Sequence, residues 1–437
     1  MSLTFPKKQL FAVLALLAAA SMWYYVRCIV VPSQEKYALE FNHPRGNLSD
    51  LYPRWLGARE LLLHGRDPYS RAITLEIQRG YWGREVDPSR PQDPKDQQAF
   101  AYPVFVVFLL APTVHMDFVA VRLLFLWLLA SCTVLSVLLW ERTLGFEMLG
   151  WRTLTVVFLL LGSYPFAEAL SVQQPILLVA VLLAGSFLAR QSGWLFLSGV
   201  LLAVATIKPQ VAVLPVVLML MWVSAEWRER QRWLWGFAAT MALLLGASEY
   251  ILPGWLFRFY DAVRAYNSYM GGTAFLDWFV TPRWSGIVRA ILVLVVLWIG
   301  WKSRRLAPDA MAARRAVSLA LVAVVCIAPN LATYNQVLLL PGLLLLLDQQ
   351  KVLQHSGMVA RNLSKIVLVL FVWPWLVCIT LIVAKMVFHA ESFVQWAWQM
   401  PLYTTPSLPV ALLALLLLWP FDTVSTQRTS PSPELLA

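Results

Sequence analysis

Long apolar runs recur along the whole chain and constrain its fold more than any other feature of the sequence. Of the 437 residues, 59% are hydrophobic and 14% are charged, whereas soluble domains carry about 25% charged residues. A helix that crosses a membrane needs roughly 20 apolar residues. The sequence therefore predicts an all-α polytopic membrane protein with about twelve transmembrane helices, over residues 10–31, 118–140, 154–170, 176–189, 194–207, 211–223, 233–252, 287–301, 316–328, 337–347, 366–387 and 402–419.

The positions of arginine and lysine predict the orientation of these runs. Basic residues gather in alternate connections, at positions 142–152, 190, 228–232, 302–315 and 351–365, and such clusters mark cytoplasmic loops. We expect a multi-pass protein of a bacterial-type inner (cell) membrane, with both termini cytoplasmic and an uncleaved first run. One transmembrane domain is expected over 1–422, with extracytoplasmic loops at 32–100 and 253–283 and a disordered cytoplasmic tail at 423–437.

Several classes of site are missing from the sequence. There is no phosphate-binding loop, no glycine-rich dinucleotide turn and no His-Glu-x-x-His or Gly-x-Ser-x-Gly motif. The four cysteines all lie in apolar segments without metal-ligand spacing, so we expect buried free thiols and no metal site. The net charge of +11 is explained by membrane topology, and nucleic acid is not an expected partner.

A polar stretch at residues 47–69 directly follows the first apolar run. Asp50 is suited to cap the start of a helix, and Gly65 is suited to end it. We expect this helix to lie on the membrane surface as an amphipathic helix, with charged residues Arg54, Arg59 and Glu60. The aromatic-rich loop at 253–283 predicts another surface helix. On spacing alone a helix cap is the favoured role of Asp50, and a functional carboxylate is the alternative.

Other polar points lie between apolar runs on the expected extracytoplasmic side, namely Tyr102, Glu168, Gln174, Lys208 and the stretch 328–336 with Asn330 and Tyr334. A lone lysine between apolar segments needs water or a counter-charge. Lys208 therefore either reaches the lipid headgroups or binds a lipid-linked phosphate. Residues 102–112 are too short to cross a membrane, so we expect a re-entrant or interfacial half-helix. Residues 86–98 are expected to form a flexible flap.

The order of these motifs resembles that of a known enzyme family. Asp50-Leu51-Tyr52, Ala58 and Gly65-Arg66-Asp67-Pro68-Tyr69 are followed by Tyr102-Pro103, Gln174, Gly199, Lys208-Pro209 and Pro329-Asn330. This order is similar to that of glycosyltransferase family 87. The resemblance implies a GT-C-type fold and an inverting transfer of a sugar, typically mannose, from a polyprenyl-phosphate donor to an extracytoplasmic glycolipid or glycan acceptor. It implies no cofactor besides the lipid-linked donor.

The resemblance also implies roles for the polar residues. Asp50 matches the position of the family's catalytic aspartate and is the expected base. Lys208, Arg54, Arg59 and Tyr102 are the expected binders of the donor phosphate, and Tyr52, Glu168, Gln174, Asn330 and Tyr334 are expected to bind substrate. The alternatives from other classes are a transporter or flippase of lipid-linked sugars and a non-catalytic scaffold.

Overall fold

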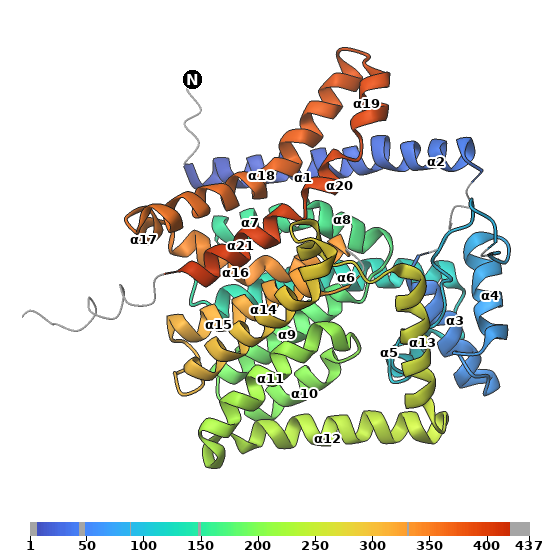
Figure 1. Ribbon diagram of the computed structural model, residues 1–437, viewed down its shortest axis with the longest axis horizontal. Helices are drawn as coiled ribbons and strands as arrows, with labels where there is room; N and C mark the ends of the chain where they lie inside the picture. Colours follow the sequence, from blue (N-terminus) through green and yellow to red (C-terminus); the bar gives the residue numbers. More distant parts are fainter. Residues whose placement is uncertain (1–6, 43–48, 88, 147–149, 330–331, 420–437) are drawn as a thin grey trace, which may run out of the picture.

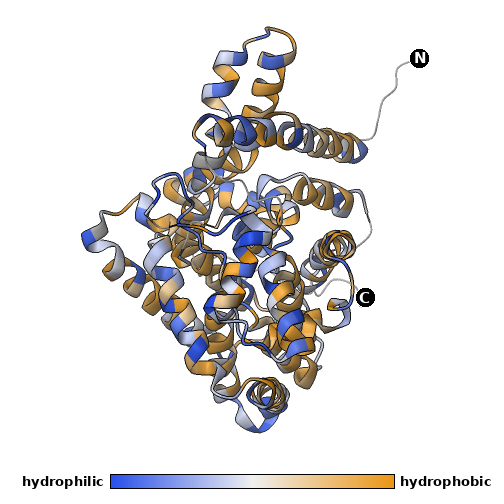
Figure 2. Ribbon diagram, turned by 90° about the vertical axis from the view of Figure 1, so that its right-hand side faces the viewer, coloured by the Kyte–Doolittle hydropathy of each residue, from blue (hydrophilic) through white to orange (hydrophobic). Residues whose placement is uncertain are grey.

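The computed structural model describes residues 7–42, 49–87, 89–146, 150–329 and 332–419. In these ranges the chain forms helices and no strands, which confirms the all-α prediction. Figure 1 shows the helices in order along the chain, and Figure 2 shows hydrophobic residues on most of them. The tail at 423–437 and Asn330 lie outside the described residues. All four cysteines are free thiols, and Cys132, Cys326 and Cys378 are buried, whereas Cys28 is partly exposed.

The described residues contain five helices that are long and apolar enough to cross a membrane, or six if one bent pair counts as a span. The first is continuous through α1 (Lys7–Tyr25), η1 (Val26–Val30) and α2 (Val31–Glu40). The others are α6 (Phe118–Thr143), α12 (Trp227–Ile251), α14 (Pro282–Ser303) and α18 (Met358–Met386). The bent pair, α7 (Trp151–Leu161) and α8 (Tyr164–Ser171), turns by 59°.

The prediction of about twelve transmembrane helices is therefore not confirmed. The remaining predicted runs do form helices, but these have only 9 to 17 residues, fewer than the roughly 20 that a span needs. They are α9 (Ile176–Gln191), α10 (Leu195–Ala205), α11 (Pro209–Ala225), α15 (Met311–Ile327), α16 (Leu340–Asp348) and α21 (Ser407–Leu418). Polar turns such as Lys208-Pro209 interrupt the apolar sequence, and these helices therefore end after fewer residues than predicted spans would need.

Helix α15 forms the centre of the protein. All of its residues from Arg315 to Cys326 are buried, as expected for a helix that is surrounded by protein on every side. It packs against α11, α14 and α21. The buried guanidinium of Arg315 donates to the carbonyl oxygens of Leu416 and Leu417, at 2.7 and 3.0 Å. This places a positive charge at the carboxyl end of α21, where the helix dipole favours a cation.

The loop at 32–100 contains α3 (Leu51–His64) and α4 (Arg71–Trp82). Helix α3 ends at Gly65, whose φ of 65° is the predicted left-handed cap. However, most of the predicted charged face is buried, because Arg54 and Glu60 are each only 8% exposed and only Arg59 is partly exposed. Both side chains form hydrogen bonds within the protein; Glu60, for example, accepts a bond of 2.7 Å from Arg66. The expectation of a helix lying on the membrane surface is therefore not confirmed for α3.

Helices α3, α4, α5 (Val106–Leu110) and α13 (Trp255–Met270) lie together at the right of Figure 1. The predicted half-helix at 102–112 corresponds to α5 and the 3₁₀ turn η2 (Ala111–Thr113), and its Val104, Val107 and Leu110 are buried in protein. The remaining elements are η3 (Phe275–Trp278), η4 (Thr333–Leu339), α17 (Gln350–Gln354), α19 (Glu391–Ala397) and α20 (Met400–Thr404).

Helices α10 and α12 touch backbone to backbone at two glycines. A Cβ atom at Gly199 would overlap the carbonyl oxygen of Trp233, and one at Gly236 would overlap that of Phe196. Close approach through small residues is how membrane helices gain packing energy. In Figure 1, α12 lies at the edge opposite α1 and α18. This contact therefore attaches an outlying helix to the body of the protein.

We expect Gly236→Ala to destabilise the protein by about 1–3 kcal/mol, because the added methyl group overpacks a close backbone contact. The midpoint of thermal unfolding in detergent measures this. Gly246→Ala is the matched control on the same helix, since no atom lies within 4 Å of its added Cβ. Equal unfolding midpoints for the two variants would contradict the packing argument.

Candidate active site

A cavity of about 540 Å³ lies where the ends of several short helices meet. Its walls come from the start of α3, the segment 96–103, the turn before α9, the turn before α11, one side of α13 and the segment that leads into η4. Among its lining residues are Asp50, Arg54, Asp96, Tyr102, Gln174, Lys208, Tyr266, Tyr334 and Asn335. The structure therefore brings together residues that are up to 285 positions apart in the chain.

Asp50 immediately precedes α3, but its side chain does not cap the helix. The carboxylate instead accepts a hydrogen bond from the amide nitrogen of Gln174 and one of 3.4 Å from the hydroxyl of Tyr81. The helix-cap role favoured by spacing alone is therefore not the role that the side chain plays. Its carboxylate faces the cavity, where it is placed to contact a ligand.

Gln174 links Asp50 to Lys208. The Gln174 amide donates to Asp50, and its oxygen lies 3.5 Å from the Lys208 ammonium. The same ammonium lies 3.5 Å from the side-chain oxygen of Asn335 and 4.8 Å from the centre of the Tyr334 ring. These partners are neutral and the hydrogen bonds are long. Lys208 lies at the cavity without a close carboxylate partner in the described part of the chain, and burial lowers the pKa of its ammonium group to about 7.

The position of Lys208 distinguishes between its two predicted roles. It precedes α11, whose first residue is Pro209, and its side chain is only 2% exposed. Its ammonium contacts protein groups that line the cavity. The alternative in which Lys208 extends to the lipid headgroups does not match this geometry.

Arg54 adds a second buried cation one helical turn after Asp50. It donates to the backbone oxygen of Asp50 and to the hydroxyl of Tyr102, and its guanidinium lies 4.0 Å from the centre of the Tyr102 ring. Tyr102 is anchored in turn, since its backbone oxygen accepts a bond of 2.5 Å from Tyr69. The predicted donor-binding residues Arg54, Tyr102 and Lys208 therefore share one cavity.

Helix α13 supplies another wall, so the predicted helix in the loop at 253–283 exists and faces the cavity. Leu256, Phe259, Tyr260, Val263, Tyr266 and Asn267 line the cavity from this helix. The helix is held by Trp255, which packs edge-on against Phe105 at 6.0 Å between ring centres, and by an ion pair of 3.0 Å between Arg258 and Asp67. Two segments that were both predicted to be extracytoplasmic therefore meet at the site.

Asp96 is a second carboxyl group in the cavity that the sequence did not single out. Its oxygens accept bonds of 2.9 and 3.0 Å from the backbone and side chain of Gln98. Burial raises the pKa of Asp96 to about 6, and the negative charge of nearby Asp50 adds to the rise. The segment 86–98, predicted as a flap, thus contributes a cavity-lining carboxyl.

Three predicted site residues do not line the cavity. The Tyr52 ring packs against Phe118 at 5.0 Å between ring centres, and the Arg59 guanidinium lies 5.4 Å from the centre of the Trp55 ring. Glu168 instead accepts a hydrogen bond from the Thr333 hydroxyl. This bond holds the first residue of η4, the element that also carries Tyr334 and Asn335.

Sequence reasoning missed Asp96 and Asn335 for different reasons. Asn335 lies in the polar stretch 328–336, which was noted as a whole, but a single sequence does not show which of its amides faces inward. Asp96 had no local signal, because its segment is rich in proline and aspartate like many loops. In the part of the chain that the structure describes, no three His, Cys, Asp or Glu side chains gather as a metal-ligand set.

Comparison with known proteins adds an independent finding. The sequence model that describes glycosyltransferase family 87 matches residues 100–347, which is more than half of the chain. This range includes Tyr102, Gln174 and Lys208, and it begins after Asp50. No curated protein matches the chain. The family match and the apolar helices agree, and the chain belongs to glycosyltransferase family 87, a family of membrane glycosyltransferases.

Proposed function

We propose that the protein transfers mannose from a polyprenyl-phosphate donor to a glycolipid or glycan acceptor, with inversion at the sugar carbon. The observation that carries this proposal is the pairing of one carboxylate with two buried cations in a single cavity, namely Asp50 with Lys208 and Arg54. A carboxylate suits removal of a proton from an acceptor hydroxyl. Buried cations suit a phosphate that leaves with negative charge.

The proposed reaction is a single displacement. Asp50 takes the proton of the acceptor hydroxyl as its oxygen forms a bond to the sugar carbon. The bond between that carbon and the phosphate oxygen breaks, and its electron pair leaves with the polyprenyl phosphate. Lys208 and Arg54 stabilise this charge, and Gln174 keeps the carboxylate and the Lys208 ammonium oriented.

We place the reaction on the extracytoplasmic face of a bacterial-type cell membrane. The support is the charge pattern, since the basic connections lie on the other side of the predicted spans. The cavity is built from the loops at 32–100 and 253–283, and both are on the side that this pattern assigns to the exterior. The same charge pattern assigns both termini to the cytoplasm.

Transfer of labelled mannose in proteoliposomes tests the function. Purified protein is supplied with polyprenyl-phosphate [¹⁴C]mannose and a glycolipid extract. The proposal predicts time-dependent label on the acceptor with release of polyprenyl phosphate. Movement of intact donor across the bilayer without transfer would instead support the flippase alternative.

Asp50→Asn should lower transfer at least about a hundredfold, because asparagine cannot accept the proton that a general base removes. Its thermal unfolding midpoint should stay near that of wild type, since the asparagine oxygen still accepts the Gln174 hydrogen bond. Asp261→Asn is the control, because Asp261 is exposed on α13 and does not line the cavity. Full activity of Asp50→Asn would show that Asp50 is not the general base and that another carboxyl group has this role.

Lys208→Ala should lower kcat/KM for the donor by about ten- to a hundredfold, the range for a lost hydrogen bond to a charged group. Initial rates at varied donor concentration measure this. Lys302→Ala, which removes an exposed lysine outside the cavity, should behave as wild type. Unchanged donor kinetics in Lys208→Ala would show that Lys208 does not bind the phosphate.

The raised pKa of Asp96 predicts a pH effect on stability. Between about pH 4 and 6 the unfolded chain releases the Asp96 proton while the folded chain keeps it, so this group lowers stability as pH rises through that window. Asp96→Asn should therefore gain on the order of 1–3 kcal/mol over wild type above pH 6, and little below pH 4. Unfolding midpoints measured from pH 4 to 7.5 check this, and a constant difference across the range would contradict it.

A further inference from the structure

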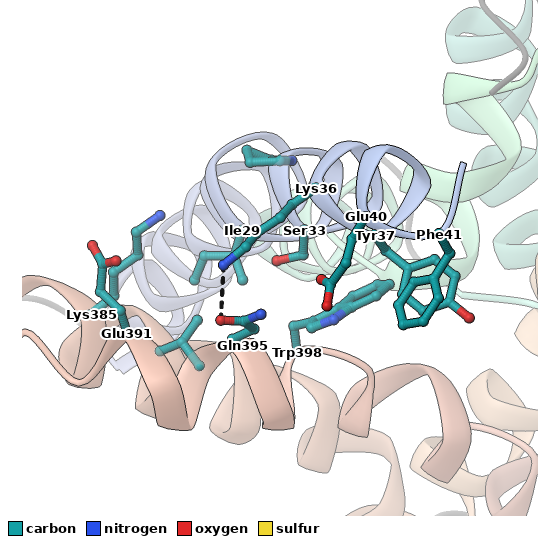
Figure 3. A pocket seen from close by; sticks show the side chains of 12 residues that line it. Ile29, Ser33, Lys36, Tyr37, Glu40, Phe41, Lys385, Glu391, Gln395 and Trp398 are labelled. Atoms are coloured by element: carbon teal, nitrogen blue, oxygen red, sulfur yellow. Dashed lines mark hydrogen bonds between the residues drawn. The ribbon is translucent and has the colours of Figure 1, made fainter. Parts of the chain in front are cut away.

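A second polar cavity, of about 420 Å³, lies between α2 and α19. Figure 3 shows its two walls, with Lys36, Tyr37, Glu40 and Phe41 on one side and Gln395 and Trp398 on the other. We call it the α2–α19 groove. It shares no lining residue with the candidate active site, so the proposed transfer reaction does not explain it.

The groove lies at the level where two membrane-spanning helices leave the apolar layer. The helix from Lys8 to Glu40 has 33 residues, more than the roughly 20 that span a bilayer, and its apolar run ends near Val31. Lys385 lies in the last turn of α18. Phe388 and Trp396 follow the groove residues Lys385 and Gln395 closely in the chain and are 72% and 74% exposed, and exposed aromatic side chains are typical of the membrane interface. These features are typical of a groove at the membrane interface.

The charged groups of the groove are balanced. Lys36 and Lys385 provide two ammonium groups, and Glu40 and Glu391 provide two carboxylates. Lys36 donates a bond of 3.0 Å to the side-chain oxygen of Gln395, and this bond joins the two walls. Lys385 donates a bond of 2.9 Å to the backbone oxygen of Cys28. Each ammonium has three N–H donors, so each can also donate a hydrogen bond to an oxygen atom of a ligand.

Aromatic rings complete the lining. The Tyr37 and Phe41 rings lie 4.6 Å apart between centres, and each side chain is about half exposed. The Trp398 indole lies on the opposite wall (Figure 3) and lines the same groove as the carboxylate of Glu40. A carboxylate beside aromatic faces favours a cationic ammonium group, through charge and through cation–π attraction.

We infer that the α2–α19 groove binds the headgroup of a zwitterionic phospholipid, with its phosphate at the lysines and its ammonium group at the glutamates and aromatic rings. A purely anionic headgroup would face the two carboxylates, and a purely cationic ligand would face the two lysines. A headgroup with both charges satisfies both sets. The volume lies in the range of about 300–1,000 Å³ that is usual for small-ligand sites.

Native mass spectrometry of the purified full chain tests this inference, with equimolar dioleoyl phosphatidylethanolamine and dioleoyl phosphatidylglycerol as probes. Two double variants remove one charge type each: Lys36→Gln with Lys385→Gln, and Glu40→Gln with Glu391→Gln. Arg79→Gln with Glu85→Gln is the matched control, because it removes an exposed ion pair on and next to α4, away from the groove. Thermal unfolding midpoints show whether each variant is folded. If a double variant does not fold, the single variant Lys36→Gln or Glu40→Gln replaces it, since both residues are exposed.

Wild type and the control should retain phosphatidylethanolamine in preference to phosphatidylglycerol. Both groove variants should lose about tenfold in phosphatidylethanolamine affinity, as expected when hydrogen bonds to charged groups are lost. The glutamate variant should also gain affinity for phosphatidylglycerol, because it no longer repels an anion. Unchanged lipid retention in either groove variant would overturn the inference, and so would a wild-type preference for phosphatidylglycerol.

Discussion

The Gln174 amide is the interaction on which the candidate active site depends. Its nitrogen donates to Asp50 and its oxygen accepts from Lys208, so one neutral side chain orients a carboxylate and an ammonium at once. In a direct ion pair, the Asp50 carboxylate and the Lys208 ammonium would bind each other and would not be available to a ligand. Separation by an amide keeps both charges at the cavity while each retains a hydrogen-bond partner, and buried polar groups need such partners.

The short helices make this arrangement possible. Asp50, Gln174 and Lys208 lie at or just before the starts of α3, α9 and α11, so three helix amino ends meet at one cavity. Backbone N–H groups at helix starts lack partners within the helix, and irregular backbone at membrane depth is tolerated where it lines a cavity. The partial positive charge of helix amino ends also favours an anionic ligand. The turns at which these short helices begin therefore create surroundings that suit an anionic ligand.

Much of the site could be predicted from sequence because its residues interrupt apolar runs. A lysine before a proline, as at Lys208-Pro209, or a glutamine pair before another apolar run, is conspicuous in such a chain. Loop residues had no such contrast, which is why Asp96 was missed. The predicted number of spans is not confirmed, because hydropathy identifies apolar segments but does not show which of them cross a membrane and which, like α15, are enclosed by other helices.

The sequence alone determined that the chain is helical and apolar, and its ordered motifs indicated the family that the comparison confirmed. Local rules also predicted the end of α3 at Gly65, because a left-handed cap needs only its own neighbours. Only the tertiary structure decided that Arg54 is buried, that Tyr52 and Arg59 do not line the cavity, and that Asn335 contacts Lys208. The physical reason is that these outcomes depend on which distant segments share a cavity, and local periodicity carries no information about contacts between residues more than a hundred positions apart.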